Sequence, residues 1–197
     1  MIEQLIQWDQ ELFLYLNGLG TTVWDAFWLT YTAKLHWIPF YAILAYLLFK
    51  RLNTKMFVLT LVVITLMISF TDQGTNFFKD LFERPRPCYQ DGVKEIMRLV
   101  KNTCGGRNSY FSGHSSNAMS LAIFVGLVMR KKYKFMIYGM IVWALLMGYS
   151  RIYIGVHYPL DVISGFLFGG LAGLGFYKLD KYIQSRYTIV ERDEEKI

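Results

Sequence analysis

Apolar residues in this chain gather into long runs that short polar segments separate. The runs are roughly 15 to 25 residues long, close to the ~20 residues that a helix needs to cross the apolar core of a bilayer. The pattern therefore predicts an all-α, polytopic membrane helix bundle of five transmembrane spans, at residues 36–50, 55–78, 113–129, 134–150 and 159–178. Residues 20–34 are the alternative for a sixth span. Asp25 and Lys34 argue against it, because charges inside a bilayer are unfavourable.

The first 17 residues combine an apolar helical stripe with interspersed acidic residues. Such a pattern predicts an amphipathic helix that lies at the membrane interface, ended by Asn17-Gly18. A short aromatic helix through about Tyr31 follows, so residues 1–34 are expected to form interfacial helices. We expect the whole chain, 1–197, to form one membrane-embedded domain with a frayed tail at 187–197.

Two patterns inside the spans concern packing and pocket lining. Gly165, Gly169 and Gly173 recur at every fourth position of the last span, which predicts close helix packing. In the second span, Asp72 lies on the same helical face as Lys79. Asp72 either lines a pocket or pairs with a cation from another span, and the second interpretation is favoured.

The composition supports a membrane protein, and the distribution of charge predicts its orientation. The chain is 54% hydrophobic and 18% charged, with a formal net charge of +6. The basic residues cluster at the ends of apolar runs, which indicates lipid headgroups and topology in place of nucleic acid. Seven of them lie in the connections at 50–55 and 130–134. By the positive-inside rule these connections face the cytoplasm, and the other ends of the spans face outward. We expect a bacterial inner membrane protein with its site on the periplasmic or exterior side.

The two cysteines, Cys88 and Cys104, both fall in the longest polar loop. A disulfide that closes this loop is one possibility in an oxidising compartment, and two unpaired thiols are the other. The spacing does not decide between them.

Three polar clusters interrupt the apolar pattern, at residues 79–87, 110–114 and 150–161. Each follows or precedes a predicted span. With alternating spans, all three fall on the same membrane face. Since one polar cluster at a helix end is ordinary but three on one face are not, the sequence predicts a shared site there.

The third cluster contains a histidine and a carboxylate that together can make a nucleophile. Pro159 suits the first turn of a helix, so His157 and Asp161, four positions apart, can meet on one face of that turn. A carboxylate that accepts a proton from one ring nitrogen leaves the other nitrogen free to attack. A second histidine, His114, remains for proton transfer. The alternative for this cluster is a polar cap on a membrane helix.

The remaining groups of the three clusters suit a phosphoryl group. Lys79, Arg86 and Arg151 offer positive charge. Ser112 can donate its hydroxyl group, and Gly113 lets an anion approach the N-terminus of a helix. Because no Cys, His and Asp set has the spacing of metal ligands, we expect neither a metal ion nor another cofactor.

These residues resemble the three motifs of the type 2 phosphatidic acid phosphatase family. The resemblance covers residues 75–180, which it identifies as the catalytic core. Arg84 competes with Arg86 as a phosphate ligand, and the motif spacing favours Arg86. Phe111 stands where the family usually has proline. The matching segments are Lys79-x6-Arg86-Pro87, Ser112-Gly113-His114 and Ser150-Arg151-x5-His157-x3-Asp161.

The resemblance implies a role for each matching residue. His157 would attack phosphorus and form a phosphohistidine, with Asp161 orienting the ring. His114 would protonate the departing oxygen and then activate water. The phosphate ligands would be Lys79, Arg86, Ser112, Gly113 and Arg151. The family also includes soluble vanadate-dependent haloperoxidases, and the predicted spans favour the phosphatase branch.

The sequence thus predicts an integral membrane phosphatase that acts on a lipid phosphate or diphosphate. One alternative is a lipid phosphotransferase with the same site, and another is a non-enzymatic lipid-binding or transport protein. The expected partners are the bilayer and a lipid phosphate, with no nucleic acid. Candidate substrates are undecaprenyl diphosphate, phosphatidylglycerol phosphate, phosphatidic acid and lipid A phosphate.

Overall fold

The fold comes from a computed structural model that describes residues 1–194, with side chains described as far as Arg186. Within this part of the chain the regular structure is helical, apart from an isolated antiparallel bridge between Pro85 and Asn108. The prediction of an all-α fold is confirmed. The helices are α1 (Ile2–Gly18), α2 (Thr22–Thr32), the 3-10 helix η1 (Lys34–Trp37), α3 (Ile38–Phe49), α4 (Thr54–Phe82), the 3-10 helix η2 (Pro87–Tyr89), α5 (Gly113–Met129), α6 (Met136–Tyr153) and α7 (Pro159–Glu194).

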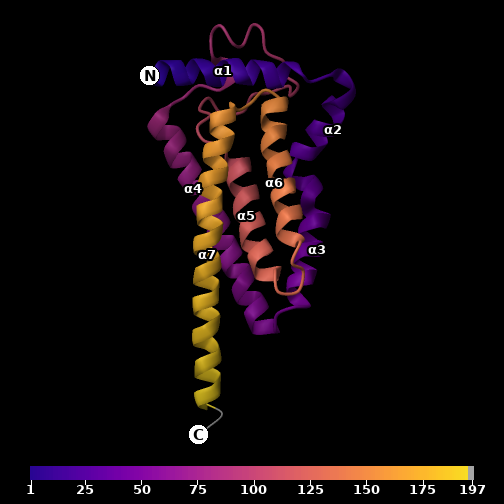
Figure 1. Cartoon of the computed structure of the whole chain (residues 1–197), viewed down its shortest axis with the longest axis vertical. Coiled ribbons are helices and arrows are strands. Elements are labelled where there is room, and N and C mark those ends of the chain that lie inside the picture. Colours follow the sequence, from indigo (N-terminus) through magenta and orange to yellow (C-terminus); the bar gives the residue numbers. More distant parts are fainter. Residues whose placement is uncertain (195–197) are drawn as a thin grey trace.

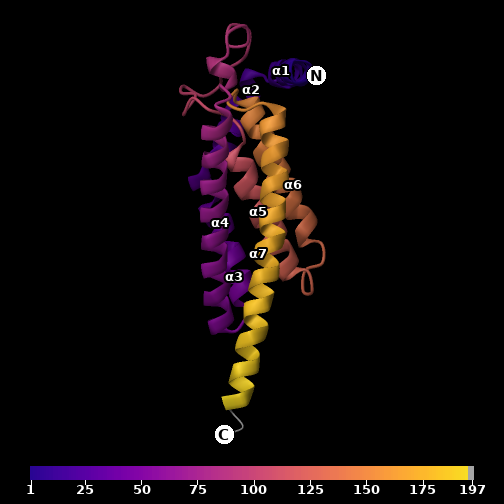
Figure 2. The same ribbon diagram turned by 90° about the vertical axis from the view of Figure 1, so that its left-hand side faces the viewer.

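Helix α5 is the central element of the bundle, and it packs against α4, α6 and α7 (Figure 1). Most of its side chains are buried, and those of Phe124, Val125 and Met129 form part of the largest apolar cluster. Helix α2 packs on α6. Helix α1 lies across the end of the bundle where α6 ends and α7 begins (Figures 1 and 2). The elements that carry the three polar clusters therefore all reach this end.

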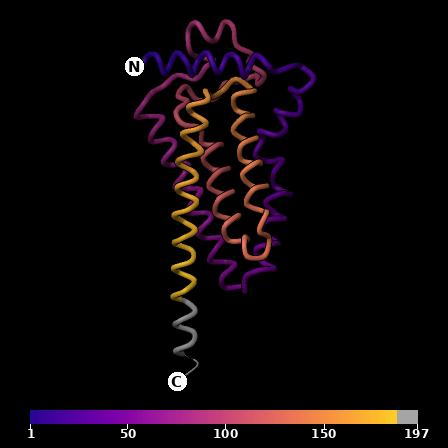
Figure 3. Tube along the Cα trace, viewed as in Figure 1, coloured from indigo at the N-terminus to yellow at the C-terminus, as the bar shows by residue number. Residues whose placement is uncertain are grey.

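Local capping chemistry sets where the helices of the bundle start. The side chain of Asn53 accepts a hydrogen bond from the backbone N–H of Met56 at 2.8 Å and so begins α4. Ser112 caps α5 in the same manner. Pro159 occupies the first turn of α7, as predicted. Helices α5 and α7 both start at the end where α4 stops, as the trace in Figure 3 shows.

Three of the predicted spans match helices that are long and apolar enough to cross a membrane. These helices are α4, α6 and the part of α7 from Pro159 to Arg186. Helix α5 coincides with the predicted span 113–129, but its 17 residues rise only about 26 Å at 1.5 Å per residue. This length is somewhat less than the ~30 Å of a bilayer core.

The predicted span 36–50 and the alternative span 20–34 are not confirmed as separate spans. Helix α3 has 12 residues and α2 has 11, each too short to cross a bilayer alone. Helix α2 and the segment Lys34–Phe49 meet the length and hydropathy criteria only as a pair bent by 66°. The break falls at Ala33, whose backbone is extended. The described chain thus has three candidate spans, or four with the bent pair.

The two ends of the chain differ in how well they match expectation. A helix forms over Ile2–Gly18 and ends at the predicted glycine, while its place at a membrane interface stays a prediction. Its buried residues are Asp9, Phe13 and Asn17, which share one face. The predicted frayed tail, 187–197, is helical as far as Glu194, because α7 continues. Residues 195–197 lie outside the described residues.

The glycines of α7 let it approach α5 closely, as predicted. A Cβ atom at Gly165 would lie 2.6 Å from the carbonyl oxygen of Ser112. At Gly169 it would lie 2.1 Å from the carbonyl oxygen of Ser116, and at Gly173 2.5 Å from that of Ser120. Contacts this short do not occur for real Cβ atoms. The glycine face therefore fixes the start of α7 against the start of α5.

Candidate active site

The three polar clusters meet at the end of the bundle beneath α1. The backbone N–H of Ser112 donates to the carbonyl oxygen of Asp161 at 2.9 Å, which joins the start of α5 to the first turn of α7. The loop after α4 reaches the same place, since Arg84 donates to the carboxylate of Asp161. Residues at or next to the ends of the second, third and last predicted spans thus come together at this end of the bundle.

His157 and Asp161 form a buried pair. Nδ1 of His157 lies 3.3 Å from Oδ2 of Asp161, and the two residues are 2% and 0% exposed. The backbone N–H of Tyr158 donates to the same oxygen at 2.9 Å, so the carboxylate is held in place. Burial lowers the pKa of His157 well below its usual range, and the positive charges of Arg151 and Arg86 lower it further. A ring in this setting is neutral at pH 7.

Arg84 occupies the other side of Asp161, a role that the sequence did not reveal. Its Nη1 donates to Oδ1 of Asp161 at 2.9 Å, and its Nη2 donates to Oδ2 of Asp9 at 2.6 Å. The guanidinium also lies over the ring of Tyr158, 4.1 Å from the ring centre. Because two carboxylates already engage Arg84, it is not free to compete with Arg86 for a phosphate.

Asp9 is the other residue that sequence reasoning missed. It is 4% exposed, and its second oxygen accepts from the backbone N–H of Leu160 at 2.8 Å. Burial raises the pKa of Asp9, and the hydrogen bond from Arg84 opposes that rise. The only signal in the sequence was an acidic residue in register with Phe13 and Asn17 on one helical face.

Lys79, Arg86 and Arg151 lie close enough to one another for their charges to repel. Arg151 is 5% exposed, and its Nη1 donates to Oγ1 of Thr32 at 2.6 Å. Its Nε has no hydrogen-bond partner, and no carboxylate pairs with it among the described residues. A buried cation without a counter-ion is unfavourable, so this position suits a bound anion.

The other two cations are held by neutral oxygen atoms. Arg86 donates from Nη1 to the carbonyl oxygen of Cys104 at 2.7 Å and from Nε to that of Asn108 at 3.2 Å. Burial lowers the pKa of Arg86. Nζ of Lys79 donates to Oδ1 of Asn76 at 3.3 Å. Neither contact cancels the positive charge.

The start of α5 supplies further donors. Ser112 is fully buried at the N-terminus of the helix. A Cβ atom at Gly113 would lie 3.3 Å from Oγ1 of Thr75 and 3.8 Å from Nζ of Lys79, so the glycine keeps this approach open. His114 follows in the first turn and is half-buried. The free N–H groups and the positive end of the helix dipole favour an anion here.

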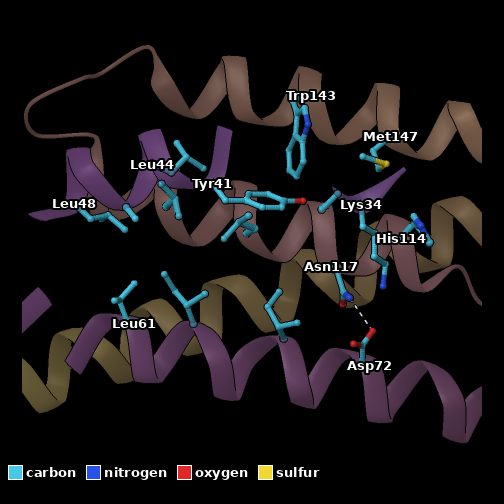
Figure 4. Close-up of a pocket in the computed structure, with 16 residues that line it drawn as sticks. Lys34, Tyr41, Leu44, Leu48, Leu61, Asp72, His114, Asn117, Trp143 and Met147 are labelled. Atoms are coloured by element: carbon cyan, nitrogen blue, oxygen red, sulfur yellow. Dashed lines mark hydrogen bonds between the residues drawn. The ribbon is translucent and has the colours of Figure 1, made fainter. Parts of the chain in front are cut away.

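A cavity of about 440 Å³ adjoins the site on the side of His114 (Figure 4). Its polar lining gathers at one end, and most of the remaining wall is apolar. His157 is not among the lining residues. The polar lining residues at that end are Lys34, Asp72, His114 and Asn117.

Two residues of this cavity correct or extend the sequence analysis. The favoured interpretation of Asp72 was wrong, because Asp72 lines the cavity and accepts from Nδ2 of Asn117 at 2.7 Å. Asn117 in turn accepts from Oγ1 of Thr71 at 2.6 Å. In the sequence, Lys34 only argues against a membrane span at residues 20–34. The bend between α2 and α3 places it in the cavity beside His114.

The loop between α4 and α5 is closed by a covalent bond. Cys88 and Cys104 form a disulfide, which decides between the two possibilities that the sequence left open. The carbonyl oxygen of Cys104 is also the acceptor for Arg86. Among the side chains that the structure describes, residues 1–186, no three of His, Cys, Asp or Glu come together as ligands for a metal ion. The groups that converge here are mainly N–H and O–H donors, which suit an anion.

Comparison with known proteins identifies the family of the chain. The sequence profile of the PAP2 superfamily matches residues 56–185, well over half of the chain. The chain belongs to the PAP2 superfamily. The match begins in α4 and ends in α7, and it therefore includes all three polar clusters. It does not include α1 or Lys34.

Two curated relatives align with nearly the whole chain. The lipid A 4'-phosphatase of Bacteroides thetaiotaomicron is 34% identical over 188 residues, which cover 94% of this chain and 83% of that protein. The lipid A 4'-phosphatase of Porphyromonas gingivalis is 32% identical over 189 residues, which cover 94% of this chain and 78% of that protein.

A solved structure shares the fold. The PAP2-type phosphatidylglycerolphosphate phosphatase of Bacillus subtilis superposes with a TM-score of 0.72 at 24% identity, over 91% of this chain and 88% of that chain. Membership of the PAP2 superfamily, with these phosphatase relatives and the apolar helices, makes this chain an integral membrane phosphatase.

Proposed function

We propose that the chain hydrolyses a phosphate monoester on a membrane lipid through a phosphohistidine intermediate. The observation that carries the proposal is the pairing of a neutral, carboxylate-bound His157 with a buried Arg151 that lacks a counter-ion. A neutral imidazole is the nucleophilic form of histidine. An uncompensated guanidinium is a ready ligand for phosphate oxygens.

In the first step, Nε2 of His157 attacks phosphorus while Nδ1–H donates to Asp161. The nitrogen–phosphorus bond forms as the bond from phosphorus to the lipid oxygen breaks. His114 gives its proton to the departing oxygen, which leaves as the lipid alcohol. Asp161 stabilises the positive charge that the ring acquires, since the carboxylate lies 3.3 Å from Nδ1.

In the second step, His114 acts as the base. It takes a proton from water, the water oxygen bonds to phosphorus, and the bond between phosphorus and His157 breaks. Inorganic phosphate then leaves, and both histidines return to their starting forms. The step requires that water, and not the lipid alcohol, occupies the side of the phosphate next to His114.

The phosphate is held by groups from three elements. Lys79, Arg86 and Arg151 supply positive charge to the outer oxygens of the phosphoryl group. Ser112 and the backbone N–H of Gly113 donate from the start of α5. Positive charge fixed in advance at the transition state is the largest contribution to this kind of catalysis.

The lipid part of the substrate belongs in the cavity beside His114. In-line attack places the leaving group opposite the nucleophile. The cavity touches His114, the proposed acid, and does not touch His157. Its apolar wall suits a hydrocarbon chain, and the polar end formed by Lys34, Asp72 and Asn117 suits the headgroup.

The substrate class that we favour is a phosphorylated glycolipid of the lipid A type. The support is that two relatives with this named activity align with 94% of the chain. We place the site at the extracytoplasmic face of a bacterial inner membrane. The support is that the basic connections at 50–55 and 130–134, which the positive-inside rule assigns to the cytoplasm, lie at the opposite end of the helices (Figure 1).

A phosphate-release assay on purified protein in detergent tests the proposal. The panel contains lipid A, undecaprenyl diphosphate, phosphatidylglycerol phosphate and phosphatidic acid. We expect release from lipid A to be fastest and unaffected by EDTA. Hydrolysis would be contradicted if no phosphate were released from any of these lipids. Transfer of the phosphate to a second lipid instead of to water would also contradict it.

A further inference from the structure

Helix α1 brings a carboxylate into the protein interior, three contacts away from the nucleophile. Asp9 accepts from Arg84 at 2.6 Å, Arg84 donates to Asp161 at 2.9 Å, and Asp161 lies 3.3 Å from Nδ1 of His157. The side chains of Asp9 and Asp161 are 2% and 0% exposed, and that of Arg84 is 17% exposed. The chain of contacts is therefore largely shielded from solvent. Charge interactions are stronger in the protein interior than in water.

With both carboxylates ionised, the three linked side chains carry a net charge of −1, because two carboxylates share one guanidinium. Without Asp9, Arg84 and Asp161 would form a neutral pair next to His157. The difference matters when the ring accepts a phosphoryl group and becomes positively charged. A net negative charge beside the ring stabilises that state, and a neutral pair stabilises it less.

Other contacts of α1 hold Asp9 in register. Asn17, two turns further along the same face, donates to the carbonyl oxygens of Ile152 and Tyr153 at 3.2 and 2.9 Å. Phe13 lies between them, fully buried, with its ring edge-on to Tyr158. The helix is thus fixed on both sides of Tyr158, directly above the His157 loop.

We propose that Asp9 is a positioning residue for His157, which acts through Arg84 and Asp161. Asp9 lies outside residues 56–185, the part of the chain that the superfamily profile matches. Helix α1 is then part of the active site, because it carries the carboxylate that contributes a negative charge near the nucleophile. The inference rests on the proposed function of His157.

Asp9 also accepts from the backbone N–H of Leu160 in the first turn of α7, so a purely structural role must be separated. Asp9→Asn achieves this separation. The amide oxygen still accepts from Leu160, while the negative charge next to Arg84 is lost. Glu11→Gln makes the same chemical change on an exposed side of the same helix and is the matched control. Asn17→Ala loosens α1 without touching the charges.

The experiment measures kcat and KM for phosphate release from lipid A, binding of vanadate, and thermal unfolding for each variant. We expect Asp9→Asn to lower kcat by about tenfold or more, the size expected for loss of one charge-assisted hydrogen bond, with KM nearly unchanged. Its affinity for vanadate, which mimics the pentacoordinate state, should fall in parallel. Glu11→Gln should match the unmodified protein in all three measurements. Asn17→Ala should lower the unfolding temperature clearly while kcat changes little.

Two results would overturn the inference. In the first, Asp9→Asn turns over and binds vanadate like the unmodified protein. In the second, kcat follows the unfolding temperature in the same way for Asp9→Asn and Asn17→Ala, which would make Asp9 only a support for α1. Vanadate binding requires no turnover, so it tests Asp9 even if lipid A is not the substrate. Failure of the unmodified protein to bind vanadate would instead contradict the proposed function.

Discussion

Arg84 donates to Asp161 through the carboxylate oxygen that His157 does not contact. The guanidinium thus fixes the carboxylate from one side while the imidazole uses the other. Arg84 is two residues from Arg86, yet the two arginines face different partners. Arg84 contacts the carboxylate that holds the nucleophile, and Arg86 lies with the cations that surround the anion site.

Replacing Arg84 by Gln should impair both folding and activity. The change leaves Asp9 and Asp161 buried without a cation, and breaking a buried pair of this kind typically costs about 3–5 kcal/mol of stability. Thermal unfolding in detergent and kcat should both fall. Arg107→Gln removes the same charge from an exposed position in the same loop and should change neither. Equal stability of the two variants would show that Arg84 is not a structural ion-pair partner.

Filling the cavity should separate lipid substrates from small ones. Leu121→Trp places a large side chain in the cavity wall, at a distance from the phosphate ligands. We expect loss of most activity on a lipid phosphate and retention of activity on a short, water-soluble phosphate ester. Leu167→Trp, on a side chain that is 65% exposed, is the control. Equal losses on both substrates would mean that the cavity does not hold the lipid.

The contact between α5 and α7 should be sensitive to a single methyl group. Gly169→Ala puts a Cβ atom 2.1 Å from the carbonyl oxygen of Ser116, and overpacking of this kind costs about 1–3 kcal/mol. The unfolding temperature should therefore fall. Gly175→Ala meets nothing within 4 Å and should be neutral or slightly stabilising, because alanine favours helix. A neutral Gly169→Ala would contradict the close packing.

The pH dependence of kcat/KM should reflect the buried imidazole. Burial, with the charges of Arg151 and Arg86, lowers the pKa of His157, so the nucleophilic neutral form persists as the pH falls. The acid limb should lie below the ordinary histidine value of about 6.5. Stability follows the same sign. The unfolded chain takes up this proton near pH 6.5, so the contribution is complete above that pH and is lost below it.

Arg86→Gln provides the internal check on this pH dependence. Removing one positive charge near His157 should move the acid limb to higher pH, although the rate also falls because a phosphate ligand is lost. Initial rates across the acid range, compared between the two proteins, measure the shift. An acid limb at or above the ordinary histidine value in the unmodified protein would show that the ring is not held neutral.

The sequence predicted the parts of the fold that depend on local pattern. Long apolar runs identify α4, α6 and α7, and the glycines at every fourth position predict the contact of α7 with α5. The three motifs and alternating spans led us to expect the residues that the structure brings together at one end. Each of these features follows from spacing along a helix, which can be read from neighbouring residues.

Features that depend on distant contacts could not be predicted in the same way. Arg84 and Asp9 are 75 positions apart, and nothing near either residue indicates the other. Asp9 has the character of a polar-face residue until α1 is seen to lie across the bundle. The bend at Ala33 directs Lys34 into the cavity. From the sequence alone, the charge of Lys34 only argues against a membrane span at 20–34.

Trapping the covalent intermediate tests the central claim most directly. Protein mixed briefly with a ³²P-labelled lipid substrate and quenched in alkali should carry the label on His157, and acid should release it. His157→Ala should carry no label, and His114→Ala should acquire its label much more slowly than the unmodified protein, since it lacks the acid that protonates the departing oxygen. Steady phosphate release by His157→Ala, or label on another residue of the unmodified protein, would contradict a phosphohistidine mechanism.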